Sequence, residues 1–180
     1  QVKLMPVPTA DKILSEKLPA FAPFYDQRLL LQQMKNVLGE ERVIDIYDIL
    51  KEHAEEELYY RTDREWTSLG AYYGYQAFAK TYHLPAAAYL KQGPEKVTED
   101  FRGGLHNKVG IASKAEDILM FPTTLDKKYT ITYDDEKITN SFYEPAYLER
   151  EDKLGYFLDG RIGMDGMDAG CACRGILLLR

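Results

Sequence analysis

The sequence is poor in the residues from which disulfides and metal sites are built. Its two cysteines, Cys171 and Cys173, are separated by one residue, so a bridge between them would be strained, and two thiols alone make no zinc site. Its three histidines belong to no metal-binding motif, and no glycine-rich phosphate loop is present. We therefore expect no metal, nucleotide or other cofactor.

The chain also lacks a basic excess and a long apolar run. It has 23 Lys and Arg against 29 Asp and Glu, a net charge of -6, and no basic stripe, which argues against nucleic acid as a partner. No apolar stretch approaches the roughly 18 residues that a membrane helix needs, so no membrane segment is expected. Because the chain begins at Gln1 without a signal-peptide pattern, we expect either a removed leader or an internal piece of a longer protein.

What is present is the composition of a globular α/β domain. The 180 residues, 45% of them apolar, suffice for one domain with a core. Apolar spacing predicts helices over 24–38, 47–53 and 67–82, strands over 2–8 and 42–46, and an extended aromatic segment over 58–61. Alternation of strand and helix over the first part of the chain is typical of a parallel sheet.

The sequence pattern changes after Pro94. Short β-type stretches over 101–104, 118–122 and 129–133, the last leading into a hairpin with 137–139, predict an inserted β-rich lobe at about 94–144. Residues 154–158 predict a late strand. Residues 161–180 show no clear period, so we interpret them as an atypical tail that follows a domain of residues 1–160.

The most distinctive segment is Tyr59–Tyr73, which begins Tyr-Tyr-Arg-Thr-Asp-Arg-Glu-Trp-Thr and continues as a small and aromatic helix. It resembles the signature of the DHHW family, whose pattern is Tyr-x-Arg-Thr-Asp-His-His-Trp-Thr. Further segments resemble that family in the same order, namely 7–10, 18–23, 101–105, 108–110 and 154–160. The resemblance covers most of residues 2–160.

The resemblance implies a three-layer SGNH-like (flavodoxin-like) α/β fold with a parallel sheet, here incomplete. The domain is similar to that of alginate O-acetyltransferases, in which an Asp-x-His-Trp element supplies the base. There the His activates a serine and the Asp orients the His. The implied chemistry is acetyl-ester transfer or hydrolysis on an extracellular glycan, with a cell-wall polysaccharide as partner and an extracytoplasmic or cell-surface location.

Carried over position by position, the resemblance makes Asp63 the orienting carboxylate and places Glu65 where the base His stands, so these two are the expected catalytic residues. Arg64 stands at the other His and Trp66 is retained. Arg61, Arg64 and Trp66 are the expected substrate-binding residues. A carboxylate at position 65 would be a weak base for a hydroxyl, and it cannot relay a proton between two nitrogens as imidazole does.

A structural interpretation of the same residues remains open. Thr62 and Glu65 have the spacing of a capping box, in which the Thr hydroxyl accepts from the N3 amide and the Glu side chain returns to the N-cap amide. Asp63 and Glu65 in a first helical turn would also suit the helix dipole. Capping would account for these polar residues without catalysis.

The serine nucleophile of the family is not evident. The serines are Ser15, Ser68, Ser113 and Ser141, and none follows a late apolar strand. A His–Ser pair could form only through folding, for example from His106 with Ser113 or Ser141. The resemblance ends at Gly160, where the family's Asn-His element is replaced. A shifted reading frame or an artificial terminus would produce that loss, and an intact frame across codon 160 would rule the shift out.

Three functions therefore stay open. The first is a degenerate or truncated member of an extracellular acyl-ester transferase/esterase-like family, without catalysis. The second is a non-catalytic module that binds cell-wall glycan or acts as a scaffold, with aromatic rings stacking on sugars. The third is an enzyme that uses Asp63 and Glu65 as a carboxylate pair.

Overall fold

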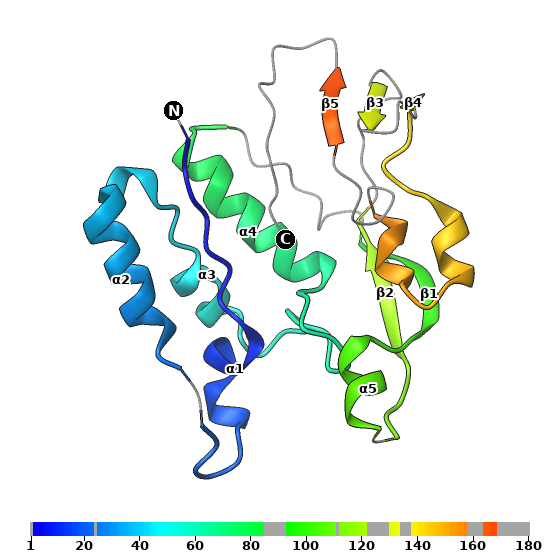
Figure 1. The fold of residues 1–180 in the computed structure, drawn as a ribbon, viewed down its shortest axis with the longest axis horizontal. Helices are drawn as coiled ribbons and strands as arrows, with labels where there is room; N and C mark the ends of the chain where they lie inside the picture. The colour runs from blue at the N-terminus through cyan, green and yellow to red at the C-terminus, as the bar shows by residue number, and fades with distance from the viewer. Residues whose placement is uncertain are drawn as a thin grey trace. The chain divides into compact units, whose positions relative to one another are not determined.

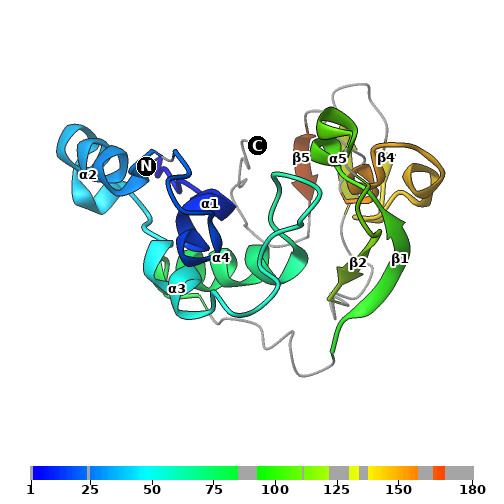
Figure 2. The ribbon, with the colours of Figure 1, turned by 90° about the horizontal axis from the view of Figure 1, so that it is seen from below.

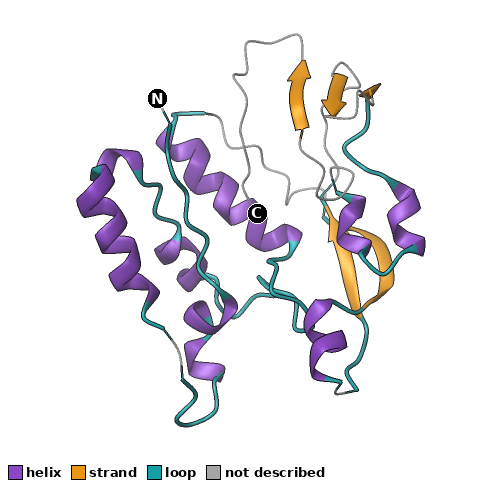
Figure 3. Ribbon diagram, in the orientation of Figure 1, coloured by secondary structure: helices purple, strands orange, loops and turns teal. Residues whose placement is uncertain are grey.

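The computed structural model describes residues 2–23, 25–84, 93–110, 112–121, 130–133, 138–157 and 164–168 (Figure 1). The chain forms two compact units, residues 1–122 and residues 123–180. Helices dominate the first part of the first unit, and short strands appear after residue 94 (Figure 3). The mixed α/β class expected from the sequence is confirmed.

The predicted helices are present within a few residues of their expected bounds. They are α2 (Gln27–Leu38), α3 (Tyr47–Glu52) and α4 (Ser68–Thr81), preceded by the short α1 (Ala10–Ile13). Asp26 caps α2 by accepting from the Arg28 amide, and Gly39 follows at a φ of 93°, which favours glycine. Single 3₁₀ turns cover Ser15–Lys17 and Glu40–Arg42.

The two N-terminal strands pair much less than the sequence predicts. They meet in one isolated parallel bridge between Leu4 and Val43, where the Leu4 amide donates to Arg42 O and the Ile44 amide donates to Leu4 O, both at 2.8 Å. Pro6 and Pro8 lack the amide hydrogen that a longer ladder requires. The parallel direction is as expected, but an extended parallel sheet is absent from the described residues, whose named sheets are antiparallel.

The core of the first unit lies between the N-terminal segment, α3 and α4. Its buried members are Ile13, Ile44, Ile46, Leu50, Leu58, Tyr59, Tyr72 and Tyr73. Tyr72 and Tyr73 belong to α4, and Leu58 and Tyr59 belong to the segment that precedes it. This core therefore fixes the start of α4 and the loop before it.

The first unit ends in an antiparallel pair with a helix between its strands. β1 (Glu95–Phe101) pairs with β2 (Glu116–Met120), with Phe101 opposite Glu116 and Glu95 opposite Met120. Helix α5 (Gly104–Val109) follows the end of β1 (Figure 2). The sequence analysis assigned 101–104 to a β-type stretch that ends in a turn, so it missed this helix.

The second unit contains the predicted hairpin. β3 (Thr130–Tyr133) pairs antiparallel with β4 (Ile138–Thr139) and, on its other edge, with β5 (Met164–Asp168). The late strand predicted over 154–158 is wrong. Residues Lys153–Tyr156 form a 3₁₀ helix, Phe157 makes a single bridge to Tyr143, and Leu158 lies outside the described residues.

Another 3₁₀ helix covers Pro145–Glu149. Strand β5 falls in the segment interpreted as a tail, and residues 169–180, with both cysteines, lie outside the described part of the chain. Over the described residues, no helix combines the length and the apolar character needed to cross a membrane.

Candidate functional site

The residues expected to carry chemistry lie in a loop of bends, Arg61–Glu65, which we call the motif loop. Its ends are held together by an antiparallel bridge between Tyr59 and Trp66 and by the Tyr60 amide, which donates to Glu65 O at 3.2 Å. Helix α4 begins only at Ser68, and Thr67 is its N-cap, accepting from the Gly70 amide at 3.3 Å. The predicted capping box of Thr62 and Glu65 is therefore wrong.

Thr62 instead binds a carboxylate from β2. The Glu116 Oε1 atom accepts from the Thr62 amide at 2.8 Å and from the Thr62 hydroxyl at 2.6 Å. Glu116 Oε2 accepts from the Arg61 amide at 2.8 Å and from Arg61 Nε at 3.2 Å. Four hydrogen bonds therefore fix the start of the motif loop to β2, and the two from Thr62 are buried because Thr62 and Glu116 are both buried.

The electrostatics of Glu116 follow from these contacts. Burial by itself raises the pKa of the Glu116 carboxyl, but the hydrogen bonds from the Thr62 hydroxyl, the two backbone amides and the Arg61 guanidinium outweigh burial. The net effect holds the pKa of Glu116 below its ordinary value of 4.5. Glu116 is therefore a buried anion at neutral pH, and it acts as the acceptor around which the loop folds.

Asp63 is also used as an acceptor for backbone amides. Its Oδ1 atom accepts from the Arg64 amide at 2.7 Å and from the Glu65 amide at 3.2 Å. Its Oδ2 atom accepts from the Gly104 amide, the first residue of α5, at 2.7 Å. The carboxylate thus shapes the loop and joins it to α5.

Helix α5 approaches the motif loop very closely. The Gly103 amide donates to the Thr62 hydroxyl at 3.0 Å, and Thr62 O accepts from the Leu105 amide at 2.9 Å. A Cβ placed on Gly103 would lie 2.4 Å from Asp63 and 2.6 Å from Thr62 O, whereas one on Gly104 would meet only Asp63 Oδ2 at 3.7 Å. Glycine is therefore required at position 103 by contact, and not at position 104.

Glu65, at the position of the family's base, has no imidazole against it. Its amide donates to Asp63, and among the described residues its side chain makes no hydrogen bond or ion pair. Arg64 is exposed, and Arg61 is exposed over 71% of its side chain although its Nε contacts Glu116. The motif loop therefore exposes the guanidinium groups of Arg61 and Arg64 to solvent. The Asp63 carboxylate between them in the sequence accepts hydrogen bonds from backbone amides.

Trp66, expected to bind substrate, packs against α4. Cβ atoms built on Gly70 and Gly74 would lie 3.0 Å and 2.8 Å from the Trp66 side chain, so both glycines make room for it. Trp66 is half-buried against the hydrophobic core, which assigns its ring a packing role in the first unit.

One serine–imidazole contact is present, and it involves a pair that the sequence analysis named. His106 Nδ1 and Ser113 Oγ are 2.8 Å apart, and both residues are half-buried. Ser141, the other serine named with His106, lies in the second unit, where its hydroxyl donates to Tyr143 O. His53 stacks on Tyr73 with ring centroids 3.9 Å apart and contacts Glu56 at 2.6 Å, a role that sequence reasoning did not anticipate.

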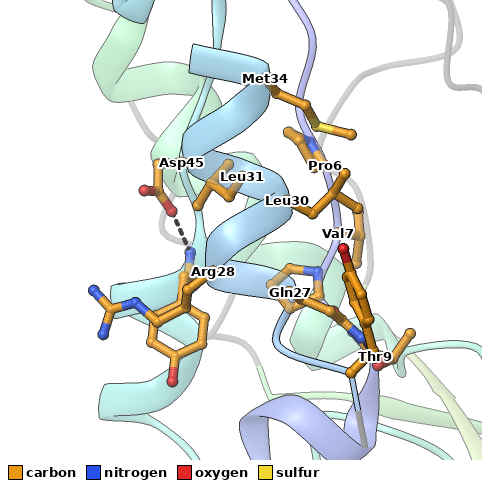
Figure 4. A pocket seen from close by; sticks show the side chains of 12 residues that line it. Pro6, Val7, Thr9, Gln27, Arg28, Leu30, Leu31, Met34 and Asp45 are labelled. Atoms are coloured by element: carbon orange, nitrogen blue, oxygen red, sulfur yellow. Dashed lines mark hydrogen bonds between the residues drawn. The ribbon is translucent and has the colours of Figure 1, made fainter. Parts of the chain in front are cut away.

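A groove of about 330 Å³ lies away from these residues, between α2 and the N-terminal segment (Figure 4). Leu30 and Met34 of α2 face Pro6 and Val7 across it, and Arg28 stacks over the Tyr47 ring at 4.7 Å. None of residues 61–66 lines it. Over the described residues there is also no cluster of three or more His, Cys, Asp or Glu side chains that could hold a metal ion.

Comparison with known proteins gave a family match and a structural match. A protein-family model described as the SGNH hydrolase-like domain of the acetyltransferase AlgX matches residues 1–146. The chain belongs to this family. The AlgX-type match includes the whole motif loop, α5 and β2, so the expected resemblance is confirmed over the part of the chain that carries the site.

A solved structure shows the same fold. The crystal structure of a DHHW family protein from Eubacterium siraeum superposes with a TM-score of 0.64 and 24% sequence identity over 88% of this chain. The chain spans 55% of the length of that protein. A search of curated proteins found no match.

Proposed function

We propose that this chain is a degenerate member of an extracellular acyl-ester, specifically O-acetyl, transferase/esterase-like family, in which the motif loop has a structural role and no longer abstracts a proton. The observation that carries the proposal is the use of Asp63. Its two oxygens accept three backbone N–H groups, from Arg64, Glu65 and Gly104. The carboxylate that orients an imidazole elsewhere in the family here orients the loop and α5.

The residue at position 65 supports the same proposal. An orienting carboxylate works by accepting a hydrogen bond from a ring N–H, and an ionised glutamate side chain has no N–H to donate. Asp63 and Glu65 could instead act together as a carboxylate pair, but pairs of that kind need their oxygens close together. Here the contact from Glu65 to Asp63 is made by the Glu65 amide.

The partner that fits the exposed part of the loop is an acidic or O-acetylated cell-wall polysaccharide. Arg61 and Arg64 are exposed, and guanidinium groups bind carboxylate and ester oxygens well. Trp66 would contribute by holding the loop against α4 more than by stacking on a sugar. Membership of the AlgX-type family supports an extracytoplasmic location and a three-layer parallel architecture.

Restoring the family residue tests the proposal. In Glu65→His, an imidazole would stand at the family position, yet no described serine hydroxyl contacts Glu65. We expect the variant to hydrolyse 4-nitrophenyl acetate and an O-acetylated polysaccharide at the rate of the wild type. A gain of tenfold or more on the O-acetylated polysaccharide, whose alkoxide leaving group is too poor for direct attack by imidazole, would show that a nucleophile lies within reach of position 65 and would contradict the proposal. Glu65→Gln, which adds no base, is the matched control.

A further inference from the structure

We propose that Ser113 and His106 form a nucleophile–base pair that accepts an acyl group, at a place outside the family motif. The inference rests on the proposed acyl-ester function and assigns the chemistry to other residues. Its basis is the 2.8 Å contact between Ser113 Oγ and His106 Nδ1, a distance at which an imidazole can take the proton of an attacking hydroxyl.

The motif loop itself fixes the position of the imidazole. The His106 amide donates to Thr62 O at 3.3 Å and to Gly103 O at 3.1 Å, while the Gly104 amide donates to Asp63 Oδ2 at 2.7 Å. Helix α5 is short, so these contacts at its first turn determine where His106 lies. Thr62 and Asp63 are then positioning residues for His106.

The end of α5 brings the serine back to the ring. Gly110 adopts a left-handed conformation with φ 65°, and its amide donates to His106 O at 3.1 Å, so the helix stops one turn after the histidine. Ser113 lies three residues after Gly110 in the sequence, and its Oγ lies 2.8 Å from His106 Nδ1. A half-buried location limits the competition of water for the hydrogen bond between them.

Other described serines lack this arrangement. The Ser68 hydroxyl donates to Leu119 O, and the Ser141 hydroxyl donates to Tyr143 O. A hydroxyl that donates to a carbonyl has no base to accept its proton as it attacks. Ser113 is therefore the hydroxyl for which the structure supplies an imidazole.

The step that the pair would perform balances without a further reactant. With His106 protonated on Nε2, Nδ1 accepts the Ser113 proton while Oγ forms a bond to the acyl carbon of an ester. The ester C–O bond then breaks, and the departing alkoxide takes the proton from the imidazolium, which leaves an acyl-serine. Water, activated by the same nitrogen, would release the acid and regenerate Ser113.

Labelling with an alkyl fluorophosphonate tests the pair in the full chain. The Ser113 oxygen would displace fluoride from phosphorus, and peptide mapping by mass spectrometry would place the adduct. We expect Ser113 to be labelled at least about tenfold faster than Ser141, and His106→Gln to slow labelling by about 100-fold, as loss of a general base does.

Matched variants make each result decisive. Ser113→Ala should abolish the adduct, and Ser141→Ala should leave it unchanged. An unlabelled Ser113, or a labelling rate that His106→Gln does not change while circular dichroism shows the same fold, would overturn the inference. The proposed function fails separately, through a gain of ester hydrolysis in Glu65→His, so the two outcomes can be told apart.

Discussion

A carboxylate is costly to bury, and Glu116 is retained because four donors surround it. Arg61 and Thr62 supply all four, two from backbone amides and two from side chains. Removing the carboxylate would leave the two buried Thr62 donors without an acceptor, which costs about 1–3 kcal/mol for a group of this kind. The shape of the motif loop therefore depends on a residue 54 positions further along the chain than Thr62.

The lowered pKa of Glu116 predicts how stability changes with pH. A carboxyl whose folded-state pKa lies below its ordinary value of 4.5 adds stability above that value and loses the contribution as pH falls through the folded-state pKa. We expect Glu116→Gln to lower the free energy of unfolding by about 2 kcal/mol at pH 7. The difference from the wild type should shrink below about pH 4, measured by urea unfolding across the pH series. A difference that stayed constant with pH would contradict the role given to the anion.

The sequence singled out the motif loop but assigned the wrong partners to its residues. Thr62, Asp63 and Glu65 were assigned to a helix start because local spacing indicates capping, which depends on neighbours three residues away. Thr62 instead binds Glu116, 54 residues away, and Asp63 binds Gly104, 41 residues away, in addition to two neighbouring amides. No local pattern contains the two distant contacts. The family resemblance singled out Asp63 but did not predict these contacts.

At the scale of elements, apolar spacing predicted α2, α3 and α4 and missed the short helix α5. Helices α2 and α4 span three turns or more, so their apolar spacing is visible in the sequence. Helix α5 has six residues and begins with glycine, and its stability comes from the contacts of its first amides with Thr62 and Asp63. The prediction of a strand over 154–158 was wrong for a similar reason. An apolar run of five residues is compatible with a 3₁₀ turn as well as with a strand.

The close approach of α5 to the motif loop gives a matched pair of glycine variants. In Gly103→Ala the new methyl group would lie within 2.6 Å of Asp63 and of the Thr62 carbonyl oxygen, so the loop and helix must separate. We expect a loss of about 2–3 kcal/mol in unfolding free energy, typical of overpacking. Gly104→Ala meets nothing closer than 3.7 Å, and a first helical turn tolerates alanine. Equal effects of the two variants on the thermal midpoint would contradict this packing.

On the scale of the whole molecule, the chain has an AlgX-type sequence and matches the fold of the Eubacterium siraeum protein over part of that protein's length. The family match covers residues 1–146, and the structural match covers 55% of the Eubacterium siraeum protein. The composition and the strand–helix order predicted the α/β class correctly. The length of the sheet was not predictable, because a parallel sheet forms between segments that local patterns do not relate.

The measurement that tests the central claim most directly is the unfolding free energy of Asp63→Ala at pH 7. Trp66 is the single tryptophan of the chain and lies beside the motif loop, so its fluorescence reports on the first unit. A structural Asp63, which binds three backbone amides, predicts a loss of about 1–2 kcal/mol. Catalytic carboxylates are commonly held at a cost in stability. An Asp63→Ala variant as stable as the wild type, or more stable, would contradict the account.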